Sequence, residues 1–476
     1  MVTSKSNKPS KIARFVVYPL LAVLFVLLAS FVLALANGYW PTMNNGRIIF
    51  VRTGMLIVAS RPSGGKIYLN NKDTKSTTGF YLFANKFSSL LPSTINVEIK
   101  KQGYRTWQKY VDIFPGVVSW ANYVLLFPEK LAIEKVTPPS GNLLSKSVDG
   151  RQLLFFEGGS SMKVTSYDSE NFSARSFWPS NTADLPVWLK APQITSASYN
   201  QSNDRVLYTI KNGDITEFVV TENNNNDIKL IILNEQLASN PSEVSFSTVD
   251  SNQLYATKDS NLYLLTSTSK SLGSSLVKNL ISYSVQNNRL IYYVSRNDQG
   301  LLLLEHMNLD GSNKQTISQS IATSGSYRFA HTPDQDILAL LNVDTKDLYL
   351  YYPGNGGKMT TLGLASGIVG MTWSRNNQKL LYYGKNSIYR YDSEKKKETF
   401  SSTTEEITSA VWFFDDCHFL ISDKQSLYVI DYDGTNKVPV SAAPISSYAI
   451  DSSNANIVFG IQNHTVIDYT KYLAQF

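Results

Sequence analysis

Apolar and polar residues follow two different patterns along the chain. Phe15 to Ala36 is an unbroken apolar run of 22 residues without a charge. Residues 54–128 and 129–476 instead show short runs that alternate with a period of two, separated by turn residues, as strands with one buried face do. Hardly any helical periodicity appears after residue 40. The pattern predicts one N-terminal helix followed by a mainly β chain.

The apolar run has the length of a transmembrane helix, since 22 residues span about 33 Å and a hydrocarbon core about 30 Å. The residues before it include the four cations Lys5, Lys8, Lys11 and Arg14 and no acid. The positive-inside rule therefore predicts a cytoplasmic stub of residues 1–14, a span over residues 15–37 and an extracytoplasmic bulk. The expected location is the plasma membrane, crossed once. Ala34-Leu35-Ala36 also fits a signal-peptide cleavage site, so retention of the helix stays open.

The next part of the chain predicts a linker, residues 38–53, and a small antiparallel β-sandwich, residues 54–128. Trp107 is expected in its core, and Gly64, Gly65 and Gly103 in turns with positive φ. Tyr39 and Trp40 fall where an interfacial aromatic belt lies. Five strands are expected: Met55–Ser60, Lys66–Leu69, Ile95–Lys100, Trp107–Ile113 and Val118–Leu126.

Three separated motifs of this domain resemble a PEGA domain. The strand from Gly54 enters the turn Arg61-Pro62-Ser63-Gly64-Gly65 and a second strand through Tyr68. Gly103-Tyr104-Arg105-Thr106-Trp107 matches a Gly-Tyr-x-x-Trp segment, and Tyr123–Phe127 matches the last strand. Gly65 and Asn70-Asn71 depart from the usual Ala and Asp-Gly. The resemblance implies an extracytoplasmic module without chemistry of its own.

Residues 129–476 repeat one unit of short strands. The centres of its second strands lie about 43 residues apart on average, near the period of a propeller blade, at Leu153, Val206, Leu254, Leu290, Ile337, Leu380, Phe419 and Ile457. Trp373 and Trp412 occupy equivalent places, as do Tyr389 and Tyr428. The turn around Asp310-Gly311 recurs at Asp433-Gly434, and Asn223–Asp227 reads as an exposed hairpin tip. The sequence predicts a β-propeller of eight blades, with seven as the alternative.

The rhythm of these units and their Asp-Gly-x-Asn turns resemble Tol-type and WD-repeat-like β-propellers of bacterial envelopes. The resemblance implies a binding or supporting role rather than a particular ligand. The last unit lacks a clear fourth strand, whereas Leu131–Val136 is a spare strand before the first unit. We therefore expect residues 131–136 to pair with the unit formed by residues 445–476 and to close the ring.

Charge divides the chain in the same places. Residues 1–14 carry +4 and residues 52–130 carry +7, whereas residues 131–476 carry −6, so the net charge of +6 describes no single part. Charged residues make up only 17% of the chain, which argues against a disordered or nucleic-acid-coating protein. A single cysteine excludes an internal disulfide.

Few residues suggest chemistry. The four histidines, His306, His331, His418 and His464, are far apart, and no nucleophile-elbow or zinc-protease motif occurs. Cys417-His418 is an adjacent pair, but strand neighbours point to opposite faces, so Cys417 is expected in a blade core. Asp415-Asp416 is expected in a turn. Asp310 and Asp433 are expected to form turns, with cation binding as the alternative.

The sequence therefore singles out no catalytic, cofactor-binding, metal-binding or other binding residue and predicts no cofactor and no enzyme. It indicates a membrane-anchored envelope protein that binds or scaffolds. Its expected partners are the lipid bilayer, through residues 15–37, and an unidentified envelope protein or polysaccharide, not nucleic acid. Two alternatives remain: an extracytoplasmic ligand sensor, and an envelope hydrolase.

Overall fold

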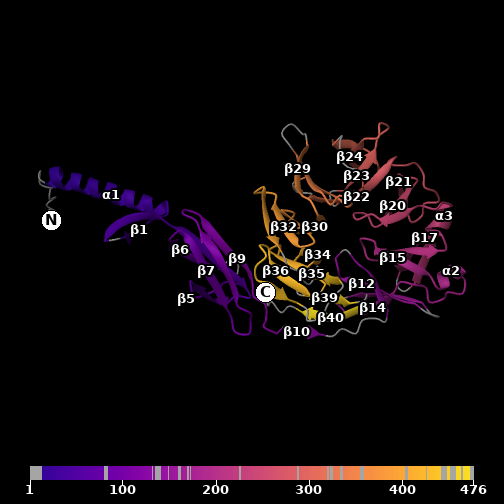
Figure 1. Cartoon of the computed structure of the whole chain (residues 1–476), viewed down its shortest axis with the longest axis horizontal. Helices are drawn as coiled ribbons and strands as arrows, with labels where there is room; N and C mark the ends of the chain where they lie inside the picture. Colours follow the sequence, from indigo (N-terminus) through magenta and orange to yellow (C-terminus); the bar gives the residue numbers. More distant parts are fainter. Residues whose placement is uncertain are drawn as a thin grey trace, which may run out of the picture. The chain divides into compact units, whose positions relative to one another are not determined.

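The structure of the chain, a computed structural model, divides into two compact units, one up to Lys130 and one from Leu131 to Tyr472 (Figure 1). It describes residues 13–471 except for 45, 80–83, 131, 135–140, 148, 159–161, 169–170, 172, 225–226, 287–288, 319–320, 322–324, 333–335, 354–358, 403–405, 425, 441–446, 451–456 and 463–464.

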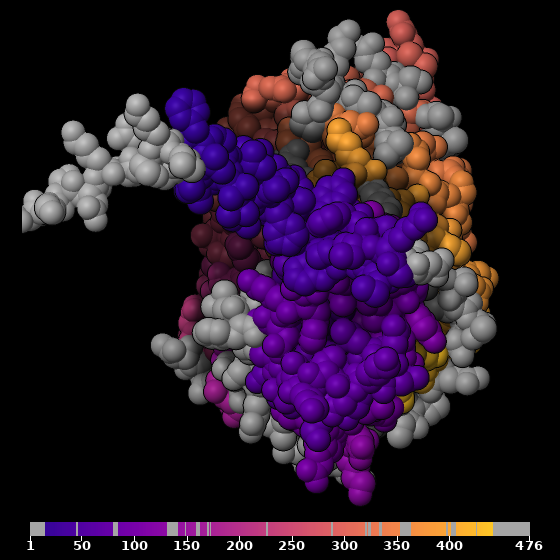
Figure 2. Space-filling view, turned by 90° about the vertical axis from the view of Figure 1, so that its left-hand side faces the viewer, coloured from indigo at the N-terminus to yellow at the C-terminus, as the bar shows by residue number. Residues whose placement is uncertain are grey.

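The first unit begins with the expected helix. A π-helical turn, Ala13–Val17, continues into α1, Tyr18–Ala36, with Pro19 in the first turn, where its missing N–H costs least. No residue of α1 is buried, and Figure 2 shows its indigo side chains uncovered. The segment Phe15–Ala36 is long and apolar enough to cross a membrane, by length and composition.

The segment expected as a linker contains a β-hairpin, which corrects that prediction. Strand β1, Tyr39–Asn44, pairs antiparallel with β2, Arg47–Arg52, in a two-stranded sheet. Gly46, with φ of 76°, permits the tight turn between them. The Phe50 ring meets Phe31 of α1 edge to face, with ring centroids 6.2 Å apart. The hairpin therefore packs against the last turns of the helix.

The small domain is a sandwich of two sheets. One sheet has the order β6-β3-β9 and the other β5-β4-β7-β8. The strands are β3 (Gly54–Arg61), β4 (Lys66–Leu69), β5 (Lys72–Thr77), β6 (Asn85–Leu90), β7 (Ser93–Lys100), β8 (Trp107–Ile113) and β9 (Val118–Leu125). Leu56 and Val124 from the first sheet pack on Ile67, Val97 and Trp107 from the second.

All five strands expected here exist, and Trp107 is buried in the core. Two points need correction. Strands β5 and β6 were not expected, and β3 pairs with β9 in parallel, so the sandwich is not wholly antiparallel. The parallel pair arises because all four strands of the second sheet, and β6 of the first, lie between β3 and β9 in the chain, and β9 then runs in the direction of β3.

The second unit contains eight sheets in its described residues, seven of four strands and one of three. The first four sheets comprise β11 (Asn142–Lys146), β12 (Gln152–Glu157), β13 (Lys163–Asp168) and β14 (Ser173–Ser176); β15 (Gln193–Tyr199), β16 (Arg205–Asn212), β17 (Ile215–Asn224) and β18 (Asp227–Ile232); β19 (Glu243–Phe246), β20 (Gln253–Lys258) and β21 (Asn261–Thr266); and β22 (Leu280–Val285), β23 (Leu290–Arg296), β24 (Leu302–Asn308) and β25 (Gln315–Ser318).

The next three sheets comprise β26 (Tyr327–Thr332), β27 (Ile337–Asn342), β28 (Leu348–Pro353) and β29 (Met359–Ala365); β30 (Ile368–Trp373), β31 (Lys379–Gly384), β32 (Ser387–Asp392) and β33 (Lys397–Ser402); and β34 (Ile407–Trp412), β35 (His418–Asp423), β36 (Leu427–Asp431) and β37 (Val438–Pro439). Two short helices, α2 (Val187–Lys190) and α3 (Leu233–Leu237), lie between strands. Each second-strand centre expected from the sequence falls in the second strand of a sheet.

Each sheet packs its faces on its neighbours in the chain. The first strands of successive sheets lie in contact: β11 with β15, β22 with β26, β26 with β30, and β30 with β34. Buried side chains fill the spaces between sheets. Leu207 of β16 shares a core with Leu254 of β20, and Leu381 of β31 shares one with Phe419 of β35.

The last sheet joins the two ends of this unit. It contains β38 (Ser447–Ile450), β39 (Ile457–Gln462), β40 (Thr465–Lys471) and, from the start of the unit, β10 (Ala132–Glu134), in the order β10-β40-β39-β38. Antiparallel pairing runs from Ala132↔Lys471 to Glu134↔Tyr469. The expected pairing of residues 131–136 is thus confirmed over 132–134. Strand β11 of the first sheet also lies against β40.

Candidate functional site

Two adjoining pockets in the second unit are lined mainly by the first strands of consecutive sheets. One, of about 570 Å³, is lined largely by β19, β22 and the start of β26. The other, of about 410 Å³, is lined by β22, β26, β30 and β34. Tyr283, Ser284 and Tyr327 line both, so the two pockets adjoin along the first strands of these sheets. We call the two pockets together the channel site.

Hydroxyl groups dominate the channel site. The larger pocket carries the hydroxyls of Ser242, Ser245, Thr248, Thr257, Ser260, Ser282, Tyr283, Ser284, Ser326 and Tyr327. The smaller adds those of Thr372, Tyr383 and Ser409. Among the described lining residues, only Glu243 and Arg328 are charged. Hydroxyl and aromatic groups bind uncharged polar ligands by hydrogen bonds and stacking, not by charge.

Several of these groups are held by contacts between sheets. The Tyr283 hydroxyl lies 2.8 Å from Ser245 Oγ of the preceding sheet. Burial raises the pKa of Tyr283 far above its ordinary value, so this hydroxyl stays neutral. The Ser282 hydroxyl accepts a hydrogen bond from the Tyr327 N–H of the next sheet, at 3.0 Å. These two hydrogen bonds tie neighbouring sheets together at the lining of the site.

Tyr383 enters the channel site because its strand partner is glycine. Gly370 lies opposite Tyr383 in the β30–β31 pair. A Cβ on Gly370 would lie 2.6 Å from Tyr383 Cζ, so the outer end of the ring packs against the bare backbone. Sequence reasoning did not identify these lining residues. The available signal was the repeated Ser/Thr alternation in first strands, as in Ser282-Tyr283-Ser284.

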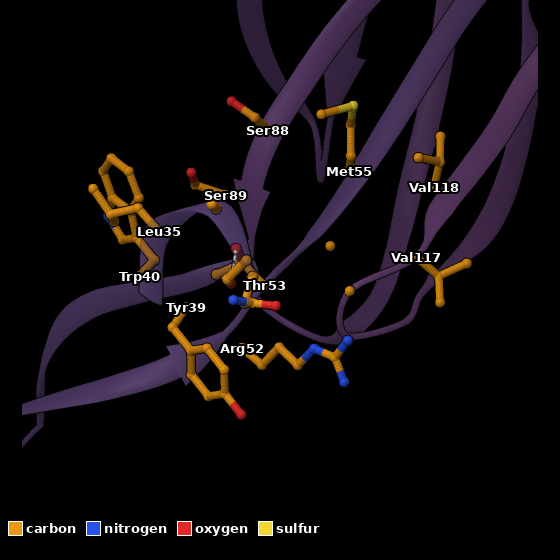
Figure 3. A pocket seen from close by; sticks show the side chains of 15 residues that line it. Leu35, Tyr39, Trp40, Arg52, Thr53, Met55, Ser88, Ser89, Val117 and Val118 are labelled. Carbon is orange, nitrogen blue, oxygen red and sulfur yellow. Dashed lines mark hydrogen bonds between the residues drawn. The ribbon is translucent and has the colours of Figure 1, made fainter. Parts of the chain in front are cut away.

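A separate pocket, also of about 410 Å³, lies in the first unit where α1 meets the sandwich (Figure 3). We call it the helix-exit pocket. It is lined by Leu35, Ala36, Asn37, Gly38, Tyr39, Trp40, Arg52, Thr53, Gly54, Met55, Ser88, Ser89, Gly116, Val117 and Val118. Arg52 is the one charged side chain in this described lining.

The adjacent pair Cys417 and His418 does not form a nucleophile and base. Cys417 is half-buried in the turn before β35, not in a strand core as expected. Burial and the neighbouring Asp415 carboxylate raise the pKa of its thiol to about 11, so the thiolate is scarce. The His418 ring is buried between two carboxylates, with Nδ1 2.6 Å from Asp415 and Nε2 3.1 Å from Asp431.

Asp415 and Asp416 lie in a turn, as expected, and have separate partners. Asp415 accepts hydrogen bonds from the N–H groups of Cys417 and His418. Asp416 accepts from the N–H groups of Arg375 and Asn376, in the equivalent turn of the preceding sheet, at 2.9 and 3.2 Å. Each carboxylate therefore secures a turn.

Asp310 and Asp433 play matching parts in their repeated turns. Asp310 accepts from the Ser312 N–H and hydroxyl, at 2.9 and 2.7 Å. Asp433 accepts from the Thr435 N–H and hydroxyl, at 3.2 and 2.7 Å. Among the described residues, no group of three His, Cys, Asp or Glu side chains is arranged to hold a metal ion.

The structure brings two of the four histidines together, which the sequence did not predict. The rings of His306 and His331 both contact Tyr292, with centroids 5.5 and 5.1 Å apart. His331 Nε2 also lies 2.9 Å from Asp336 Oδ1. His464 lies outside the described residues.

No protein-family model and no curated protein matches the sequence. Solved structures similar to this chain include dipeptidyl peptidase 4 of Porphyromonas gingivalis (14% identity, TM-score 0.49, 67% of this chain and 56% of that chain) and a eukaryotic initiation factor (11%, 0.48, 70% and 86%). Another is Sqt1 of Saccharomyces cerevisiae (9%, 0.47, 72% and 98%). At TM-scores below 0.5, these likenesses support no statement about activity or partners.

Proposed function

We propose that this chain is a membrane-anchored, extracytoplasmic protein of the cell envelope that binds another macromolecule. Its second unit acts as an eight-bladed β-propeller. Its small domain, which follows the anchor in the chain, acts as a PEGA-like module. Binding and scaffolding, rather than catalysis, are its role. The observation that carries the proposal is the channel site, two adjoining pockets lined by hydroxyl and aromatic groups along the first strands.

The sheet order supports the propeller. In the part of the chain that the structure describes, eight sheets follow one another in chain order, and β10 adds an outer strand to the last of them. A ring of blades needs such a joint because each blade otherwise contacts only its neighbours. The uncovered apolar helix α1 supports the anchor, since a soluble chain does not leave so many large apolar side chains in water. The cations that precede the helix favour a cytoplasmic N-terminus, which puts the second unit on the extracytoplasmic side of the membrane.

The lining of the channel site supports an uncharged polar partner, such as a neutral stretch of polysaccharide. Sugars present hydroxyls and apolar ring faces, which match serine, threonine and tyrosine side chains. The end of the Tyr383 ring packs against Gly370, and the Tyr283 hydroxyl is hydrogen-bonded to Ser245. Such side chains give up little conformational entropy on binding, because they are already ordered.

A blocking substitution tests this function. Ser284 borders both pockets of the channel site, so Ser284→Trp obstructs both. Ser173→Trp places the same side chain on the exposed outer strand β14 and serves as the matched control. The full chain in detergent is passed over immobilised envelope polysaccharide and, separately, over immobilised envelope protein.

We expect the wild type to bind the polysaccharide and Ser284→Trp to bind about tenfold more weakly or worse, equal to about 1.4 kcal/mol or more. Ser173→Trp should bind within about twofold of wild type. Equal binding by both variants would show that the channel site is not used. If the chain binds only the immobilised protein, and Ser284→Trp weakens that binding, the partner is a protein and not a polysaccharide.

A further inference from the structure

The helix-exit pocket is held rigidly to the end of α1. The N–H and the hydroxyl of Thr53 both donate to the Gly38 carbonyl, at 2.7 and 2.9 Å. The Gly116 N–H donates in turn to the Thr53 carbonyl, at 2.8 Å. These hydrogen bonds connect the end of the helix, the base of the hairpin and the loop before β9 to one another. The pocket therefore keeps its place relative to the helix.

Arg52 supplies the pocket with a single exposed cation. Its guanidinium lies over Gly116, where a Cβ would come within 2.6 Å of Arg52 Cζ. Figure 3 shows the side chain extending along the pocket toward the loop that carries Val117. No acidic residue belongs to the described lining, so the cation faces no carboxylate there. An arginine presented in this way suits a phosphate, whose oxygens accept two parallel N–H bonds.

The other polar groups of the pocket fit the same ligand. The side chains of Ser88 and Ser89 lie across the pocket from Arg52 and supply hydroxyl donors (Figure 3). Tyr39 and Trp40 supply rings with one polar edge each, the chemistry found where proteins meet lipid headgroups. The pocket thus combines one cation, several hydroxyls and aromatic walls.

The hairpin beside the pocket extends the apolar surface of the helix. Trp40, Met43, Ile48 and Phe50 are all exposed, Met43 by 75%. The open edges of a two-stranded sheet need water or headgroups as partners, so this hairpin suits the bilayer interface rather than its hydrocarbon core. Phe15 through Phe31 still supply the roughly 17 residues that a span requires at minimum. The pocket then opens at headgroup level.

We propose that the helix-exit pocket binds the phosphate of an anionic phospholipid headgroup, with Arg52 as its principal ligand. The proposal rests on the proposed membrane anchor. The net charge of +7 over residues 52–130 attracts the domain to an anionic membrane surface more than to a zwitterionic one. Trp40 and the exposed hairpin side chains supply the contact with the acyl boundary that a free phosphate ion does not use.

The test is a titration of the full chain in a neutral detergent with short-chain phosphatidylglycerol, and in parallel with inorganic phosphate. Binding is read by native mass spectrometry, which counts bound lipid directly. Arg52→Gln removes the cation, and Arg52→Lys keeps the charge but loses the planar fork. Arg105→Gln removes the same charge elsewhere in the small domain and is the matched control, because Arg105 does not line the pocket.

We expect one saturable phosphatidylglycerol site, weakened about tenfold or more by Arg52→Gln and less by Arg52→Lys, since bonds to charged groups contribute about 1.5–3 kcal/mol. Arg105→Gln should bind within about twofold of wild type. Equal losses in Arg52→Gln and Arg105→Gln would overturn the site. If inorganic phosphate saturates the site as well as phosphatidylglycerol does, the claim that the ligand is a lipid is wrong. Because the titration needs neither the channel site nor a cell, it fails independently of the proposed function.

Discussion

His418 is a buried cation held between two carboxylates. Burial by itself lowers the pKa of the imidazole, but the Asp415 and Asp431 carboxylates outweigh it and raise the pKa to about 10. A group whose pKa is higher in the folded state than its unfolded value of about 6.5 stabilises the fold fully below that value. This stabilisation is lost as the pH rises toward 10.

We therefore predict that His418→Gln lowers the free energy of unfolding by about 3–5 kcal/mol at neutral pH, because it leaves two buried carboxylates without their cation. The difference in stability between wild type and variant should shrink as the pH rises from 7 to 10. Chemical denaturation across that range measures it. Cys417→Ser, at the neighbouring half-buried position, is the control. A difference that does not depend on pH would contradict a charged His418.

The pKa of His331 shifts in the opposite direction from that of His418. Burial lowers the pKa of its imidazole, and the nearby Asp336 carboxylate offsets this only in part. A base whose pKa is lower in the folded state stabilises the fold above the unfolded value of about 6.5 and destabilises it as the pH falls further. Its ring stacks on Tyr292 at the junction of two sheets, so protonation places a charge in a largely apolar contact.

We predict that His331→Gln flattens the loss of thermal stability between pH 6.5 and pH 4.5. Thermal unfolding of wild type and variant, compared at each pH, measures the effect. The variant is expected to be less stable than wild type at pH 7.5, because the Tyr292 contact is weakened, and to approach it in acid. If the unfolding temperatures of wild type and variant fall in parallel with pH, His331 does not gain its proton in this range.

At the scale of elements, one tryptophan hydrogen bond recurs between neighbouring sheets. Trp373 at the end of β30 donates its indole N–H to the Ala330 carbonyl of β26, at 3.1 Å. Trp412 at the end of β34 donates to the Thr372 carbonyl of β30, also at 3.1 Å. Equivalent residues of successive repeats therefore join the first strands of neighbouring sheets in the same way.

Trp412→Phe is predicted to lower the free energy of unfolding by about 1–3 kcal/mol, since it removes the donor and leaves a carbonyl without its partner. Trp120→Phe is the control, because Trp120 is 54% exposed on β9 of the other unit. Urea denaturation followed by circular dichroism compares the two. If Trp412→Phe lowers the free energy of unfolding as little as Trp120→Phe does, the indole hydrogen bond contributes little to stability.

The pairing of β10 with β40 can be tested by a disulfide. Ile133 and Thr470 are direct partners in the antiparallel register. In a Cys417→Ser background, the Ile133→Cys, Thr470→Cys double variant should cross-link on oxidation. The closed loop should stabilise the unit by about 2–4 kcal/mol or more over its reduced form. Unlinked protein after oxidation, with both thiols reactive, would contradict the pairing.

The sequence identified strands that bury an apolar face and missed strands that do not. Every second strand of the repeats, such as β23 with Ile291 and Tyr293, is apolar enough to recognise. Strands β5 and β6 lie at sheet edges and are mostly polar, so propensity and alternation do not reveal them. Gly65 was expected to have a positive φ. It instead makes room for Ile99, whose Cγ2 would lie 2.6 Å from a Cβ.

The channel site escaped sequence analysis for a related reason. Its residues are ordinary serine, threonine and tyrosine side chains, each unremarkable in its own repeat. They become a site because the first strands of several sheets bring them together, as Ser245 meets Tyr283 across two sheets. The helix-exit pocket likewise depends on Arg52, Ser88 and Gly116, which the sequence separates widely.

For the whole molecule, the proposed function requires a retained membrane anchor with the sheets of the second unit outside the cell. A single cysteine at Ser284, in a Cys417→Ser background, reports the channel site, and a cysteine at Ser6 reports the N-terminal stub. A membrane-impermeant maleimide is applied to intact cells and, separately, to lysed cells, and full-length protein is recovered from the membrane fraction. Both cysteines should react after lysis.

In intact cells, we predict labelling of the Ser284→Cys variant and none of the Ser6→Cys variant. Labelled protein should remain in the membrane fraction at full length. Labelling of Ser284→Cys only after lysis would contradict an outward-facing channel site. A labelled product that has lost its N-terminal helix would contradict the retained anchor.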